Sequence, residues 1–323
     1  MKCLVNILFI IFCLFFISCN NANEQNKTAP TTKEELGKLL FSDPILSQNN
    51  QISCASCHIP EYAFADTSAV SKGVDGKTGT RNTPSAMNQN ARNFFFHDGR
   101  AETLEEQAAG PIENPVEMNL PIAEAIKKLN NNKEYHTYFN NIYKKSADRE
   151  SILDAIAAFE RTLETSNSPF DRYMKGDSTA ISKSAQRGQE IFNVKGKCFD
   201  CHFGPDFTGD DFKNIGLYNG KELNDRGRAE ITKNDADIGK FKVPGLRNIA
   251  VTAPYMHNGM FKTLTEVIDY YNTPTDFVKG SINTDTLIQK PLNLTAQEKI
   301  DLLEFLKSLT DERFKTTASQ IKQ

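Results

Sequence analysis

The chain has 323 residues, of which 39% are hydrophobic and 24% charged, and it is long enough for two domains with apolar cores. Its 38 basic and 41 acidic side chains give a formal net charge of −3. This balance excludes the strongly basic surface with which proteins bind nucleic acids, so no nucleic-acid partner is expected. The seven cysteines lie near the N-terminus or in two C-x-x-C pairs, which leaves none for a disulfide framework.

The N-terminus has the pattern of an export signal. Lys2 supplies a positive charge, residues 4–17 are almost entirely apolar, and the small Ser18 precedes Cys19. The apolar run is short for a transmembrane helix, which needs about 20 residues. A signal that ends in Ser-Cys resembles that of bacterial lipoproteins, so we predict removal of residues 1–18 and lipidation of Cys19. Plain cleavage and an uncleaved anchor are the alternatives.

The segment 19–32 is polar and lacks periodicity, which predicts a flexible tether. An exported lipoprotein with such a tether is expected in the periplasm. It would contact the membrane only through its lipid anchor.

The first folded unit is predicted over residues 33–165. Leucines with helical spacing predict a helix at residues 33–41, and a second apolar stripe predicts one at residues 150–164. Residues 42–101 between them are rich in Gly, Pro, Asn and Ser, which indicates loops. The turn-forming segment 166–179 is predicted to be a linker between two domains.

The second folded unit is predicted over residues 180–312. Helices are expected at residues 181–192, at the segment TLTEVIDYYN, and from Thr295 onward, where Glu298 completes a capping box. Both units therefore share one layout of helix, C-x-x-C-H, long loops and helix, and no sizeable sheet is indicated. The sequence predicts an all-α protein with an internal duplication.

Two C-x-x-C-H motifs carry the chemistry. Cys54, Cys57 and His58 form the first motif. Cys198, Cys201 and His202 form the second. Such a motif attaches haem c through two thioethers, and the histidine becomes an axial iron ligand. A zinc site would not require a histidine after both pairs, and a thioredoxin-like pair would need a βαβ pattern, so two covalent haems are predicted.

The sequence resembles the bacterial dihaem cytochrome c peroxidase and MauG superfamily over residues 34–310. The resemblance rests on the two haem motifs together with GTRNTPS (79–85), HDGRAETLEEQAAGPIENPVEM (97–118) and VPGLRNIAVTAPYMHNGMFKTL (243–264). It implies two cytochrome c-like domains, each around one covalent haem c. It also implies that the N-terminal haem reacts with hydrogen peroxide, that the C-terminal haem transfers electrons, and that Ca²⁺ lies between them.

The resemblance also implies roles for individual residues. Gln107, Pro111 and Glu117 match the distal pocket of the peroxide-reacting haem, where Glu117 is the candidate acid and base. Arg247 matches an arginine near the haem propionates. The positions that match the calcium ligands are Asn82, Thr252 and Pro254.

The chain departs from the peroxidase pattern at the axial ligands. The loop 61–82 has no histidine to cap the first haem, so that iron is expected to be open or bound by water in the oxidised protein. Tyr271 occupies the position of the usual methionine ligand of the second haem, and a tyrosine there is typical of MauG-like proteins. A phenolate favours ferric iron, whereas methionine favours reduction. Met256 and Met260 are the competing ligands.

A third departure concerns the tryptophan that the family places between the haems. Here the residue is His97, which is a poorer carrier of electrons or radicals and is expected to titrate, to bridge propionates or to approach an iron. His257 is expected to be structural, near the haem edge. His136 is expected to be exposed on a helix.

We therefore predict a peroxidase that receives electrons from a small cytochrome c or cupredoxin. The alternatives are a MauG-like oxidase acting on an oxidisable protein substrate, a non-catalytic dihaem electron carrier, and a peroxide sensor with slow turnover. The family resemblance also suggests a homodimer.

Overall fold

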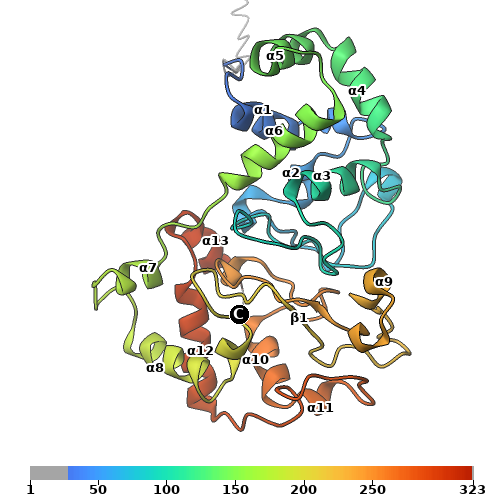
Figure 1. Ribbon diagram of the computed structural model, residues 1–323. Helices are drawn as coiled ribbons and strands as arrows, with labels where there is room; N and C mark the ends of the chain where they lie inside the picture. The colour runs from blue at the N-terminus through green and yellow to red at the C-terminus, as the bar shows by residue number, and fades with distance from the viewer. Residues whose placement is uncertain (1–27, 322–323) are drawn as a thin grey trace, which may run out of the picture.

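The computed structural model describes residues 28–321 (Figure 1). The predicted signal peptide, Cys19 and most of the predicted tether lie outside the described residues. Residues 28–31 have no regular secondary structure. Within the described range no helix combines the length and the apolar character needed to cross a membrane.

The chain forms two helical lobes, coloured blue to green and yellow to red in Figure 1. The helices of the first lobe are α1 (Lys33–Ser42), α2 (Cys54–Cys57), α3 (Leu104–Glu113), α4 (Ile122–Asn131), α5 (Lys133–Tyr143) and α6 (Arg149–Arg161). The helices that follow are α7 (Pro169–Met174), α8 (Lys183–Asn193), α9 (Ala229–Thr232), α10 (Leu264–Asn272), α11 (Pro274–Phe277), α12 (Ala296–Ser308) and α13 (Lys315–Gln320). Long loops with single 3₁₀ turns connect them.

Strand structure is minimal. The two-residue strands β1 (Phe212–Lys213) and β2 (Phe241–Lys242) pair antiparallel, with Phe212 opposite Lys242. They form the one sheet among residues 28–321. The predicted all-α fold is confirmed.

The internal duplication is visible in how the helices cross. Gly37 of α1 packs on the backbone of Ala155 in α6, where an added Cβ would lie 1.8 Å from the carbonyl oxygen. Gly188 of α8 packs in the same way on Asp301 of α12, at 1.9 Å. Any larger residue at either glycine would force the helices apart. Each lobe is therefore built on one close helix pair with a glycine at the crossing.

Aromatic packing repeats between the lobes as well. Four residues after each glycine, a phenylalanine meets a phenylalanine of the partner helix. Phe41 packs on Phe159 at 5.2 Å and Phe192 packs on Phe305 at 5.1 Å, both edge to face. Such aromatic pairs stabilise beyond their buried area. These pairs lie in two separate hydrophobic cores, one in each lobe.

Most predicted helices are confirmed, and the capping box of Thr295 and Glu298 is present. The segment 166–179 is not a plain linker, because it contains the short helix α7. Ser168 caps this helix with Asp171, and a proline at the first helical position has the right backbone angle. Phe170 then packs into the core of the second lobe.

The end of the chain joins the two lobes. Phe314, just before α13, packs into the core of the first lobe although it follows the last helix of the second. Asp311 accepts hydrogen bonds from the backbone of Ser166 and Asn167 in the connection between the lobes. Asn248, which is fully buried, donates to Thr165. These contacts fix the second lobe against the first.

Candidate functional site

The two C-x-x-C-H segments have the same local geometry. Each forms a single turn of helix in which the histidine N–H donates to the carbonyl of the first cysteine at 2.8 Å, from His58 to Cys54 and from His202 to Cys198. The four cysteines are free thiols. In each motif the turn keeps two thiols and one imidazole close together, as attachment of haem c requires.

The two imidazoles are held in the orientation of iron ligands. The Nδ1 of His58 lies 3.0 Å from the carbonyl oxygen of Phe64, and that of His202 lies 3.0 Å from that of Phe207. A carbonyl accepts, so Nδ1 carries the proton and Nε2 is left with its lone pair. Burial lowers the pKa of both histidines, which keeps them neutral. Both imidazoles are therefore prepared to bind a metal.

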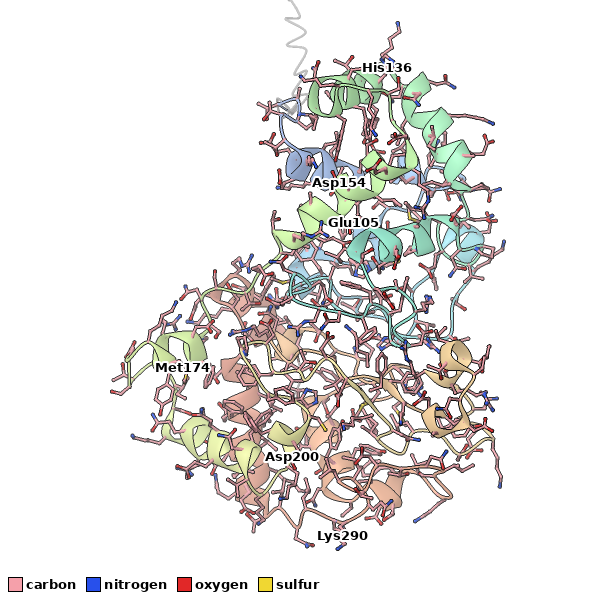
Figure 2. The ribbon with its side chains drawn as sticks, viewed as in Figure 1. Glu105, His136, Asp154, Met174, Asp200 and Lys290 are labelled. Atoms are coloured by element: carbon pink, nitrogen blue, oxygen red, sulfur yellow. The ribbon has the colours of Figure 1, made fainter. Side chains whose placement is uncertain are left out.

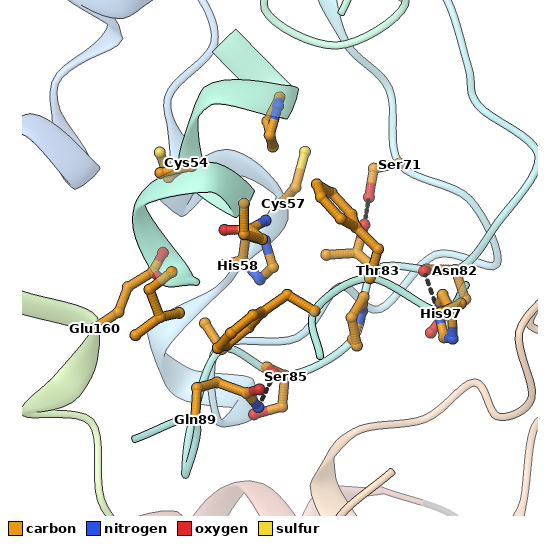
Figure 3. Close-up of a pocket in the computed structure, with 18 of the residues that line it drawn as sticks. Cys54, Cys57, His58, Ser71, Asn82, Thr83, Ser85, Gln89, His97 and Glu160 are labelled. Atoms are coloured by element: carbon orange, nitrogen blue, oxygen red, sulfur yellow. Dashed lines mark hydrogen bonds between the residues drawn. The ribbon is translucent and has the colours of Figure 1, made fainter. Parts of the chain in front are cut away.

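A cavity lies beside His58 (Figure 3). Helix α3 places Gln107 and Pro111 four residues apart on the face that lines this cavity, and Glu117 lines it from the turn that follows. The structure thus brings together the three predicted pocket residues and the first haem motif. Thr103 caps the N-terminus of α3, and Pro111 lies in its last turns.

Glu117 is held by its neighbour Asn114. The Nδ2 of Asn114 donates to the Oε1 of Glu117 at 2.6 Å. Burial raises the pKa of Glu117, and this hydrogen bond partly opposes the rise. A carboxyl group whose pKa is raised accepts a proton more readily than an ordinary carboxylate and can return it.

Glu160 is a cavity residue that the sequence analysis missed. It is 7% exposed, lines the same cavity from α6, and lies on the opposite side of His58 from His97 in Figure 3. No described residue donates a hydrogen bond to its carboxyl group. Burial raises its pKa to about 8. The signal in the sequence was a glutamate four residues after Ile156 on the apolar stripe of a helix.

Asn82 of the first lobe and the segment 252–257 of the second present several oxygen atoms at the boundary between the lobes. The backbone N–H of Asn82 donates to His257 at 2.7 Å, and its Nδ2 donates to Ser68 and Ala69. Its Oδ1 accepts no hydrogen bond from the described residues. The carbonyls of Thr252 and Pro254 likewise accept none. Neutral oxygens of this kind suit Ca²⁺.

The imidazole of His97 is held by a hydrogen bond. Its Nε2 lies 3.0 Å from the carbonyl oxygen of Asn82, to which it donates. Burial lowers the pKa of His97 to about 4, so the ring is neutral. His257, also neutral with a pKa of about 4 because of burial, stacks on Phe241 at 3.8 Å. His136 is exposed on α5 at the far end of the first lobe, as predicted (Figure 2).

Tyr271 lies at the second haem motif. Like Cys198, it is partly buried and packs against the core of the second lobe, and desolvation raises the pKa of its phenol. The hydroxyl of the adjacent Tyr270 donates to Ile215, whereas the Tyr271 hydroxyl has no hydrogen-bond partner among the described residues. Met256 packs against the same core. The competing Met260 is 37% exposed.

Arg247 lines the first cavity from the second lobe. Its guanidinium forms ion pairs with Asp171 at 2.9 Å and Asp206 at 3.2 Å. It is therefore placed at the boundary between the lobes, with its charge already balanced by two carboxylates.

Comparison with known proteins agrees with this geometry. Residues 31–179 match the family model described as di-haem cytochrome c peroxidase, and residues 185–310 match that of cytochrome c. The chain is 34% identical to the cytochrome-c peroxidase IdrP1 of Pseudomonas sp. (strain SCT), covering 88% of this chain and 83% of that protein. It is 35% identical to the methylamine utilization protein MauG of Methylophilus methylotrophus, covering 88% and 84%.

This chain belongs to the di-haem cytochrome c peroxidase family. A crystal structure of a MauG-like protein associated with microbial copper homeostasis superposes with a TM-score of 0.81 at 32% identity, covering 90% of this chain and 94% of that one. The expected superfamily and the expected pair of cytochrome c-like domains are thus confirmed. As a member of this family the protein carries two haems.

Proposed function

We propose that this protein reduces hydrogen peroxide at a haem held by Cys54, Cys57 and His58. The observation that carries the proposal is the cavity beside His58, into which Glu117 projects with its raised pKa. When bound, the haem iron supplies the electrons that break the O–O bond. Glu117 takes a proton from one peroxide oxygen and returns it to the departing oxygen, which leaves as water. Gln107 and Pro111 shape the same pocket.

Electrons enter through the second haem, held by Cys198, Cys201 and His202. This motif lies at the surface, with Phe199 48% and Phe203 43% exposed beside it. Such exposure supports electron delivery by a partner protein, for which we propose a small cytochrome c or cupredoxin. Tyr271 is the proposed sixth ligand, because it lies near Cys198 and Cys201 and its hydroxyl has no hydrogen-bond partner among the described residues.

The protein is also proposed to hold a calcium ion and to lie in the periplasm. Asn82, Thr252 and Pro254 would hold Ca²⁺ through one side-chain oxygen and two carbonyls, with waters completing the shell. The Ser18–Cys19 junction supports a periplasmic lipoprotein. His97, which donates to Asn82, would couple the calcium site to the region between the haems.

A second candidate is a MauG-like oxidase that acts on a protein substrate. It is favoured by the absence of a histidine in the loop 61–82 and by the position of Tyr271. Both features suit a first haem that reacts with peroxide while fully oxidised. The family resemblance supports both candidates, and a dihaem electron carrier without catalysis is the remaining alternative.

One experiment separates these candidates. The oxidised, haem-loaded protein is mixed with hydrogen peroxide in a stopped-flow spectrometer without reductant. A rapid absorbance change supports the open first haem and the MauG-like mechanism. A change only after addition of one electron indicates a peroxidase that needs reductive activation, with His97 the first residue to test as the cap. No change in either state rejects both enzymatic functions.

A further inference from the structure

The cavity beside His58 is lined by residues of both lobes, and several of them are cationic. From the first lobe come Arg81, Arg92 and Arg100, and from the second come Lys242 and Arg247. Five cations around one cavity indicate an anionic occupant, unless each has its own protein counter-ion.

The four arginines do have such counter-ions. Arg81 pairs with Asp98 and with Asp225, and Arg100 also pairs with Asp98. Arg92 and Arg247 both pair with Asp206, and Arg247 has Asp171 as well. Their charges are therefore balanced without a ligand.

Lys242 differs from all of them. Its Nζ makes no hydrogen bond or ion pair with a described residue, and it lies 6.0 Å from the centre of the Phe95 ring. Asp210 attracts it, but no oxygen of that carboxylate lies within the 4.0 Å of an ion pair. Burial lowers the pKa of Lys242 to about 8, and the nearby Arg92 acts in the same direction. An unpaired ammonium in such a place is costly unless an anion joins it.

Lys242 is also held firmly in position. It lies in β2, where it pairs with Phe212, and its backbone N–H donates to the carbonyl of His97 at 2.8 Å. The strand therefore delivers a cation of the second lobe to the cavity of the first.

We propose that Lys242 binds a propionate of the haem attached to Cys54 and Cys57. This inference rests on the first haem site of the proposed function. A c-type haem is anchored by its vinyl edge, and its two propionates lie on the opposite edge of the porphyrin. The pair would join the haem of one lobe to the backbone of the other through a charge-assisted hydrogen bond. Lys242 is thus a positioning residue that tunes the first haem, and it takes no part in proton transfer.

The test compares Lys242→Met, Lys242→Gln and Lys242→Arg with the unchanged protein, all loaded with haem. Resonance Raman spectroscopy reports the propionate bending modes, and spectroelectrochemistry gives the reduction potential of each haem. Loss of the cation should shift a propionate band of the first haem. It should also lower the potential of that haem, with a change of about tenfold in the reduction equilibrium, or ~59 mV for one electron. Lys242→Arg should largely restore both values.

Two control variants separate this contact from its neighbours. Lys240→Met removes a cation two residues away that pairs with Asp237, and it should leave both readings unchanged. Asp210→Asn removes the nearby carboxylate and should leave the propionate band in place. The proposal is overturned if Lys242→Met and Lys242→Gln leave the band unchanged, or if Asp210→Asn shifts it as they do.

Failure of the proposed function would give results that differ from failure of the Lys242 contact. Haem content, measured as the pyridine haemochrome, shows whether the first haem is attached at all, and a protein with one haem would overturn the propionate contact and the peroxide site together. A protein with two haems that ignores peroxide would reject the activity alone. The Raman and potential measurements would then still decide the role of Lys242.

Discussion

Asn114 Nδ2 lies 2.6 Å from Glu117 Oε1 and donates to it at the edge of the cavity beside His58. The two residues are three apart in the turn that follows α3, and Glu117 N–H donates to the carbonyl of Asn114 in return. This mutual contact fixes the direction of the carboxylate. The group that would move the proton is therefore oriented before peroxide arrives, which is what efficient acid–base catalysis requires.

We predict that Glu117→Gln slows the reaction of the oxidised protein with peroxide by about 10²- to 10⁴-fold, the usual contribution of a positioned acid or base. The amide keeps the shape of the side chain but cannot take the proton. Stopped-flow rates at several peroxide concentrations measure the effect. The matched control is Glu113→Gln at the end of α3, which is exposed and should react normally because its amide oxygen can still accept from Ile122. Equal rates for the two variants would contradict the assignment.

Tyr271 and Tyr270 provide an internal comparison for the second haem. We predict that Tyr271→Met raises the reduction potential of this haem, because a neutral thioether replaces an anionic phenolate that stabilises ferric iron. The absorption of phenolate-ligated ferric haem should disappear in the same variant. Spectroelectrochemistry and the visible spectrum measure both effects.

The control for this prediction is Tyr270→Phe, which removes the hydrogen bond to Ile215 but no ligand, and which should leave the spectrum unchanged. Met256→Leu distinguishes the competing ligand. If that variant alters the spectrum and Tyr271→Met does not, methionine is the ligand.

Glu160 makes the stability of the protein depend on pH. Its pKa is about 8 in the folded protein against an ordinary value of 4.5, so the folded state holds one more proton between these values. Stability should therefore fall as pH rises from 4.5 to about 8, by at most ~1.4 kcal/mol per pH unit from this group, and level off above that range. Thermal unfolding of the haem-loaded protein from pH 5.5 to 8.5 measures the slope.

Glu160→Gln should flatten this dependence, because the amide does not ionise. It should also make the protein more stable at pH 8, where the wild-type carboxyl begins to lose its proton in an apolar site. Glu61→Gln, an exposed carboxyl on the loop after His58, is the control and should keep the wild-type slope. An unchanged slope in Glu160→Gln would show that the carboxyl finds a partner in the loaded protein.

The sequence predicted the parts of this molecule that depend on local patterns. The helices at residues 33–41 and 181–192 follow from apolar spacing, and the last helix from the capping box of Thr295. Helix α3 was not predicted as an element; Gly110 and Pro111 are poor helix formers, but the Thr103 cap and four buried apolar positions hold a helix. Its role in lining the cavity came from family resemblance alone.

Long-range relationships could not be predicted in this way. Phe314 follows the second haem unit in sequence but packs in the core of the first lobe, and no periodicity signals such a return. The unpaired ammonium of Lys242 is recognisable only once the arginines around it are seen with their counter-ions. Charges that compensate one another across two lobes are a property of the packed structure.

The proposed calcium site at Asn82 can be tested by thermal unfolding. We expect Ca²⁺ added to the chelator-treated, haem-loaded protein to raise its melting temperature by a few degrees, because an ion that binds only the folded state stabilises it by about 2.7 kcal/mol at a hundredfold excess over Kd. Asn82→Ala should abolish this response, since it removes a side-chain oxygen that accepts no hydrogen bond from residues 28–321. The response to Ca²⁺ is compared within each variant, so any lower starting stability of Asn82→Ala does not affect the result. Mg²⁺ is the control ion, because it demands a stricter geometry and should have little effect. A full Ca²⁺ response in Asn82→Ala would place the ion elsewhere.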